Sequence, residues 1–173
     1  MTTVPNSPIA FAIAFILSNF TAVTFVLALL LASIIRRGPA ANRYLAWLCL
    51  LPIGIGTLWG AFYHLAFPGF AAHFIGWADS PFQFEVGMAD LAIGVAGCIA
   101  FRASYGFQAA TVIVTSIAFL GDALGHIRQM HLANNHAPGN AGSVFYFDIL
   151  IPLTALAFLL AAKRQPSATT TQP

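Results

Sequence analysis

Charged side chains are scarce in this chain. Of its 173 residues only 7% are Asp, Glu, Lys or Arg, whereas 59% are hydrophobic and the mean hydropathy is +0.82. Soluble globular domains carry roughly 25% charged residues, so the composition excludes a soluble domain anywhere along the chain. The net charge of +2 is small and no basic stripe is present, which argues against nucleic acid as a partner. What remains is an integral membrane protein with the lipid bilayer as its main partner.

Cysteines and signal-peptide features are also sparse. The two cysteines, Cys49 and Cys98, lie inside apolar runs and lack metal-ligand spacing, so we interpret both as buried thiols. The first eight residues contain no Lys or Arg. A cleaved signal peptide would have a basic n-region and a shorter apolar segment than the one that follows here. We therefore predict a retained first helix.

Five apolar segments reach the length of about 20 residues that a bilayer crossing requires. They are residues 9–35, 44–67, 82–101, 107–130 and 144–162. The sequence thus predicts an all-α fold, a polytopic transmembrane helical bundle of five spans, with residues 1–164 as one domain. Four spans with a peripheral first helix are the alternative. The polar, proline-punctuated tail, residues 165–173, is predicted to be disordered.

Basic residues are confined almost entirely to one side of the predicted bundle. Six of the seven flank the first and third connections or follow the last span: Arg36, Arg37, Arg43, Arg102, Lys163 and Arg164. Only Arg128 falls on the other side. Because short cytoplasmic loops carry the excess of Lys and Arg, we expect the N-terminus outside and the C-terminus in the cytoplasm. The predicted location is the cell membrane, inner or plasma, with several crossings.

Acidic residues gather on the side opposite the basic ones. All five lie in or at the rim of the predicted outer half of the membrane, and the five histidines fall on the same side. An ionisable group inside a span is costly and usually faces the bundle interior, where it marks a site. Stacking the spans at comparable depth selects six residues from four helices: His64, Glu85, Asp90, Asp122, His126 and Asp148.

The third predicted span has two faces of small residues. At 3.6 residues per turn, one face contains Gln83, Gly87, Asp90, Gly94 and Gly97, and another contains Glu85, Ala89, Ala92, Ala96 and Ala100. Small residues let membrane helices approach closely. We therefore predict a central helix with neighbours on two sides.

The fourth and fifth predicted spans carry the remaining acids. Asp122 and His126 are one helical turn apart and can meet on one side of the helix. Gly121 and Gly125 form a small-xxx-small pair beside them, which favours a close helix neighbour. Asp148 precedes a proline by four positions, and the missing proline N–H leaves the carbonyl of residue 148 free.

The outer connection, residues 131–143, permits two interpretations. Pro138 and Gly139 indicate a turn, and Asn140 and Gly142 tolerate unusual backbone angles. The connection joins two acid-bearing spans, so it is either a lid over the site with His136 reaching down, or a plain surface connection.

Two stretches resemble a known family. They are residues 80–90 (SPFQFEVGMAD), and residues 125–130 (GHIRQM) together with 135–142 (NHAPGNAG). Over residues 63–153 the chain resembles an uncharacterised family of small bacterial integral membrane proteins with a domain-of-unknown-function label. The resemblance implies a bacterial membrane protein and supplies no activity.

A metal-ion site is the leading functional prediction. Mixed carboxylate and imidazole ligands suit Zn, Mn or Fe, and the six selected residues are the candidate ligands. The Glu-x-x-His repeats of di-iron bundles are missing, so we predict no di-iron oxygenase. A haem between His64 and His126 is disfavoured because carboxylates are unusual neighbours for two axial imidazoles.

Two other functions fit the same residues. One is a proton-coupled carrier with Asp90 and the Asp122/His126 pair as relay groups, although the acids stop about halfway across the membrane. The other is an accessory or structural subunit of a larger membrane complex or homo-oligomer, which small helix faces and sixteen phenylalanines would suit. The residues assign no reaction.

Overall fold

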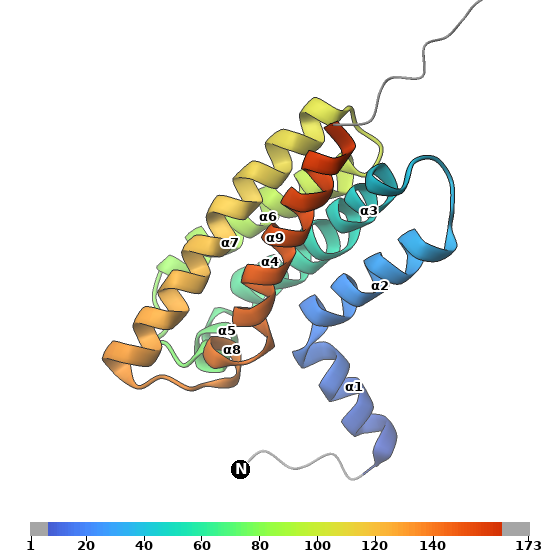
Figure 1. The fold of residues 1–173 in the computed structure, drawn as a ribbon. Helices are drawn as coiled ribbons and strands as arrows, with labels where there is room; N and C mark the ends of the chain where they lie inside the picture. The colour runs from blue at the N-terminus through green and yellow to red at the C-terminus, as the bar shows by residue number, and fades with distance from the viewer. Residues whose placement is uncertain (1–6, 164–173) are drawn as a thin grey trace, which may run out of the picture.

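The computed structural model describes residues 7–163, and every regular element in that range is helical (Figure 1). The elements are α1 (Pro8–Ser18), α2 (Phe20–Ile34), α3 (Ala40–Leu48), the π-helical segment η1 (Cys49–Gly56), α4 (Thr57–Ala66), α5 (Pro68–Ile75), α6 (Phe82–Ala100), α7 (Tyr105–Ala133), α8 (Pro138–Ala141) and α9 (Ser143–Lys163). The all-α prediction is confirmed for these residues. The tail predicted to be disordered lies outside them.

Four helical stretches are long and apolar enough to cross a membrane. They are Ala40–Ala66, Phe82–Ala100, Tyr105–Ala133 and Pro138–Lys163. The first runs through α3, η1 and α4 as one continuous rod, and the last joins α8 to α9. These four stretches coincide with the second to fifth predicted spans, because each is a long apolar run.

The first predicted span, residues 9–35, consists of two shorter helices instead of one. α1 has 11 residues and α2 has 15, and they are separated at Asn19. The side-chain amide of Asn19 donates a 2.9 Å hydrogen bond to the carbonyl of Phe15. Such local side-chain bonds compete with helix continuation. In Figure 1, α1 leaves the end of α2 at an angle and stands apart from the rest of the bundle.

The glycine face of α6 packs closely on the η1–α4 rod, as predicted. A methyl group placed on Gly94 would come within 2.7 Å of Leu58, and one on Gly97 within 2.7 Å of the backbone nitrogen of Gly54. On the second small face Ala89 and Ala92 are exposed, whereas Ala100 at the end of α6 is fully buried. The predicted neighbour on that side is therefore missing along Ala89 and Ala92 and present at Ala100. Small residues permit close approach but do not by themselves recruit a partner.

A π-helical segment, η1, lies between α3 and α4. Pro52 has no N–H to donate and lies inside η1, and π-helical turns are frequent at functional sites. Beyond it, the hydroxyl of Thr57 donates to the carbonyl of Ile53. The helix then continues through Gly60 to His64.

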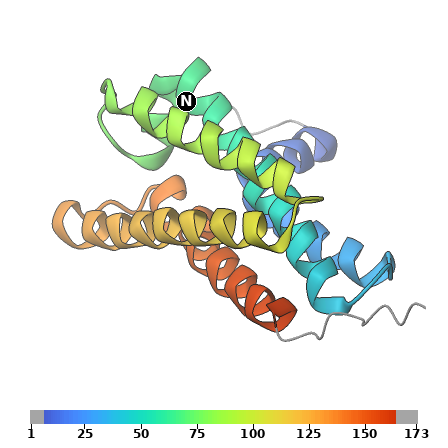
Figure 2. The same cartoon turned by 90° about the horizontal axis from the view of Figure 1, so that it is seen from above.

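One end of the bundle is capped by the two short helices, α5 and α8 (Figure 1). α7 ends at Asn134, which has a left-handed backbone with φ 50°. The side-chain amide of Asn135 donates to the carbonyl of Ile75 at 2.9 Å, which ties the α7–α8 connection to the end of α5. Gly139 of α8 lies against Phe74 of α5, where an added methyl group would meet the ring. Viewed from above, α6 and α7 diverge toward this capped end (Figure 2).

Candidate functional site

A cavity of about 520 Å³ lies at the capped end of the bundle. Five of the six predicted site residues line it: His64, Asp90, Asp122, His126 and Asp148. They come from α4, α6, α7 and α9, so four helices converge on one space. Glu85, the sixth, is exposed and is not part of the lining. It is on a different face of α6 from Asp90, as their five-residue spacing requires.

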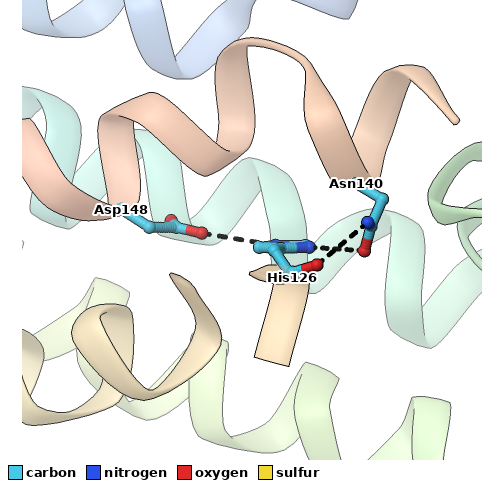
Figure 3. A network of polar contacts seen from close by, with 3 residues as sticks. All are labelled: His126, Asn140 and Asp148. Carbon is cyan, nitrogen blue, oxygen red and sulfur yellow. Dashed lines mark hydrogen bonds and ion pairs between the residues drawn. The ribbon is translucent and has the colours of Figure 1, made fainter. Parts of the chain in front are cut away.

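His126 is held between two polar side chains (Figure 3). Its Nε2 lies 3.4 Å from a carboxylate oxygen of Asp148, and its Nδ1 lies 2.8 Å from the side-chain oxygen of Asn140. All three residues are buried, with exposed fractions of 5% for His126, 7% for Asp148 and 0% for Asn140. The sequence suggested that His126 pairs with Asp122 on its own helix. The ion-pair contact is instead to Asp148 on α9.

The hydrogen bonds of Asn140 determine where the protons of His126 are. The amide nitrogen of Asn140 donates to the carbonyls of Asn135 (2.9 Å) and His126 (3.3 Å). Its oxygen must therefore accept from His126, so Nδ1 carries a proton. If Nε2 were unprotonated, it would present a lone pair to the Asp148 carboxylate. A proton on Nε2 or on the carboxyl of Asp148 makes the 3.4 Å contact between them favourable.

Asp90 has no such partner. Among residues 7–163 its carboxylate has no hydrogen bond and no ion pair, although it is mostly shielded from solvent. It faces α4 at Gly60, where an added methyl group would be 2.9 Å from its Oδ2. Asp122 and Asp148 are close enough to repel it electrostatically. An ionised carboxylate that is shielded beside like charges is energetically costly, and the cost is relieved by protonation or by a bound cation.

Asp122 is the most exposed of the acids in the cavity wall. It is flanked by Gly121 and Gly125, which also line the cavity. A methyl group added at either glycine would meet nothing within 4 Å. The spacing of this small-xxx-small pair suggested a close helix neighbour. The pair does not pack against one. It leaves open space on the face of α7 that carries Asp122.

His64 is bound to a residue on α6. Its Nδ1 lies 2.7 Å from the side-chain oxygen of Gln83, which is 3% exposed. A carboxamide oxygen only accepts, so Nδ1 carries the proton and Nε2 has the lone pair. Within the described part of the chain, no side chain or backbone group forms a hydrogen bond or ion pair with that Nε2.

The rest of the cavity wall is largely apolar and rich in aromatic rings. On α4 the rings of Trp59 and Tyr63 meet edge to face, with centroids 4.9 Å apart. Phe20 of α2 lies 4.8 Å from Trp59, and Phe70 of α5 lies 5.4 Å from Tyr63. All four rings line the cavity. It therefore combines carboxylates from α6, α7 and α9 with an aromatic surface from α2, α4 and α5.

The charges in the cavity wall are of one sign apart from its histidines. Three carboxylates line it, and no Lys or Arg among residues 7–163 does so. In the same part of the chain, no three His, Cys, Asp or Glu side chains are clustered closely enough to hold a metal ion as they stand. Described residues between 91 and 118 take no part in the lining, so the cavity does not continue along α6 and α7 toward the basic end.

Sequence reasoning missed three features of this site. The sequence marks Asn140 only as a turn residue, yet it is fully buried and orients His126. Gln83 was placed on the correct face of α6, but its contact with His64 was not foreseen. The aromatic rings of α4 carry a detectable signal, since Trp59 and Tyr63 are four residues apart on one helix face. His136, proposed to reach down from the connection, is exposed.

Comparison with known proteins gives a family but no activity. Residues 18–168 match the family of unknown function DUF6790. The match extends well beyond the residues 63–153 over which the resemblance was recognised. No curated protein and no solved structure shows significant similarity to this chain.

Proposed function

Because this chain belongs to DUF6790, a family of unknown function, we propose its role from the site itself: it is a membrane protein that binds a cation in the capped cavity. The observation that carries the proposal is the charge of the cavity wall. Asp90, Asp122 and Asp148 line it together with no Lys or Arg among the described residues. Of the three, Asp148 alone has a direct partner within residues 7–163, which is His126.

The physical reason is the cost of unpaired carboxylates within a membrane. Carboxylates there pair with other groups or mark ion and substrate sites. Asp90 and Asp122 repel one another and have no hydrogen-bond or ion-pair partner in the described chain. A bound cation would remove that repulsion and supply the missing partner for both. The residues assign no chemical reaction, so the proposed function is to bind the cation or to transport it.

A divalent transition metal, Zn, Mn or Fe, is one form that this cation would take. Its ligands would come from Asp90, Asp122 and the free Nε2 of His64, since mixed oxygen and nitrogen donors suit these ions. The side chains would have to move together to enclose it, because no three of them are clustered in the described structure. Glu85 lies outside the cavity lining and is not proposed as a ligand.

We place the cavity at the outer face of a bacterial cell membrane. Five of the six Lys and Arg residues within 7–163 belong to the other end of the bundle, which supports a cytoplasmic C-terminus. α1 and α2 would together complete a fifth crossing, with the N-terminus outside. α2 alone has 15 residues, or about 22 Å at 1.5 Å per residue, which is short of a bilayer core.

Assembly with a second copy or another membrane protein is a second role, and one observation favours it. Ala89 and Ala92 leave a small-residue strip exposed on α6, and such strips allow close helix contacts in membranes. A proton-coupled path through the bundle has less support, because the cavity stops short of the basic end. The hydroxyl groups that such a path would use, those of Thr111 and Thr115, both donate hydrogen bonds to the backbone of their own helix.

Thermal stability of the full chain in detergent tests the cation proposal. Purified wild type and an Asp90→Asn/Asp122→Asn double variant would be heated with a panel of metal ions, organic ammonium ions and matched anions. At least one cation should raise the unfolding temperature of wild type and not of the double variant. No cation stabilising wild type, or equal stabilisation of both proteins, would contradict the proposal.

A further inference from the structure

The form of the cavity narrows the chemical class of its ligand. Resting on the proposed cation site, we infer that the ligand is a protonated organic amine with an apolar body, with its ammonium group at Asp90 and Asp122 and its body against the rings of Trp59 and Tyr63. The inference rests on three features: the size of the cavity, the arrangement of its donors and its aromatic wall.

The cavity is far larger than a bare metal ion requires. Its volume of about 520 Å³ falls in the range of roughly 300–1,000 Å³ typical of small-molecule sites. Structural and catalytic metals need three or four protein donors at roughly 2.0–2.6 Å from the ion. The described side chains provide no cluster of three. An organic ion fills the cavity without requiring the four helices to move together around a single metal ion.

The polar groups suit an ammonium group that donates several hydrogen bonds. A primary ammonium has three N–H donors, and Asp90 and Asp122 supply acceptors that no described group of the chain uses. The unprotonated Nε2 of His64, opposite its bond to Gln83, supplies a further acceptor in the same wall. No Lys or Arg in the described lining would repel the ligand.

The aromatic wall suits the apolar part of such a ligand and its charge. Trp59, Tyr63 and Phe70 form consecutive ring contacts at 4.9 and 5.4 Å between centroids. Aromatic faces attract organic cations and bury alkyl or aryl groups. A hydrated inorganic ion would gain little from this surface, whereas an arylalkyl ammonium would use both halves of the cavity.

Calorimetric titration with three probes tests the inference on the full chain in detergent. The probes are 2-phenylethylammonium, its uncharged counterpart 2-phenylethanol, and Zn²⁺. The amine should bind at least about tenfold more tightly than the alcohol, because only the amine forms charge-assisted hydrogen bonds. Asp90→Asn should lower the affinity for the amine by about tenfold or more. Glu85→Gln, on another face of the same helix, should leave that affinity unchanged. Trp59→Leu should weaken the amine and leave Zn²⁺ binding unaffected.

The outcomes separate this inference from the function on which it rests. Zn²⁺ binding that depends on Asp90, without amine binding, would overturn the organic ligand and keep the cation site. Equal affinity for the amine and the alcohol, or amine binding unaffected by Asp90→Asn, would overturn the organic ligand. Either result together with no Asp90-dependent binding of Zn²⁺ would overturn the cation site as well. Asp122→Asn provides a second charge-neutral variant if Asp90→Asn does not give a monodisperse protein, and it should weaken the amine in the same way.

Discussion

The side-chain oxygen of Asn140 lies 2.8 Å from Nδ1 of His126, and neither residue exposes more than 5% of its surface. Asn140 also donates to two backbone carbonyls, one of them that of His126 itself. A single side chain thus joins α8 to α7 and fixes the orientation of the histidine that faces Asp148. The cavity wall on this side depends on that connection.

Replacing Asn140 with Ala should therefore destabilise the protein. The change leaves the carbonyl of Asn135 and Nδ1 of His126 buried without partners, and each lost buried hydrogen bond costs about 1–3 kcal/mol. Titration with SDS in mixed micelles would measure the free energy of unfolding. His136→Ala, four residues away and exposed, is the matched control and should change it by less than about 0.5 kcal/mol. Similar effects for the two variants would contradict the role given to Asn140.

A second pair of variants tests which face of α6 is packed. Gly94→Leu should destabilise by about 1–3 kcal/mol through overpacking, because even a methyl group there would come within 2.7 Å of Leu58. Ala92→Leu, on the exposed face, should have little effect on unfolding of the isolated chain. A large loss of stability from Ala92→Leu would show that α6 has a neighbour on that face, such as a second copy.

Gly60 allows the Asp90 carboxylate to approach α4, so Gly60→Ala should displace that carboxylate. The added methyl group would be 2.9 Å from Oδ2, a contact that the short side chain can relieve only by moving. We expect cation affinity to fall several-fold, with the chain still folded. Gly106→Ala on α7 also adds a methyl group in open space, but outside the cavity lining, and it should bind as wild type does. Unchanged affinity in Gly60→Ala would separate Asp90 from the binding site.

Reporter fusions test the orientation in the membrane. A reporter after Arg164 should be cytoplasmic, and one inserted near Asn135 should be external, because five of the six described basic residues lie at the end away from the cavity. A reporter before Pro8 should be external if α1 and α2 together form a fifth crossing. Finding both termini on one side would instead support four crossings with a peripheral α1.

The positions of the helices, and the end of the bundle at which the acids lie, follow from local patterns and were predictable. Four apolar runs produced four helices of spanning length. Asp90 and Asp148 line one cavity because charged groups in a span face inward. Periodicity also identified the glycine face of α6 that packs on α4.

The remaining features depend on contacts between distant segments. The side chain of Ala92 is as small as that of an alanine packed against a neighbouring helix, so its residue type does not distinguish the two cases. Ala92 is exposed because of where the other helices lie. Asn140 follows a Pro-Gly turn signal, but its partner His126 is fourteen residues away on another helix. At Asn19 a single side-chain bond to Phe15 accompanies the break in an otherwise continuous apolar run. Hydropathy along the sequence does not detect such a break in a helix.

A cation that binds in the cavity should contact the carboxylate of Asp90. Infrared difference spectroscopy of the full chain, recorded before and after addition of a cation that stabilises it, measures this directly through the carboxylate stretching bands. A band shift is expected in wild type that persists in Glu85→Gln and disappears in Asp90→Asn. A difference spectrum of Asp90→Asn identical to that of wild type would contradict it.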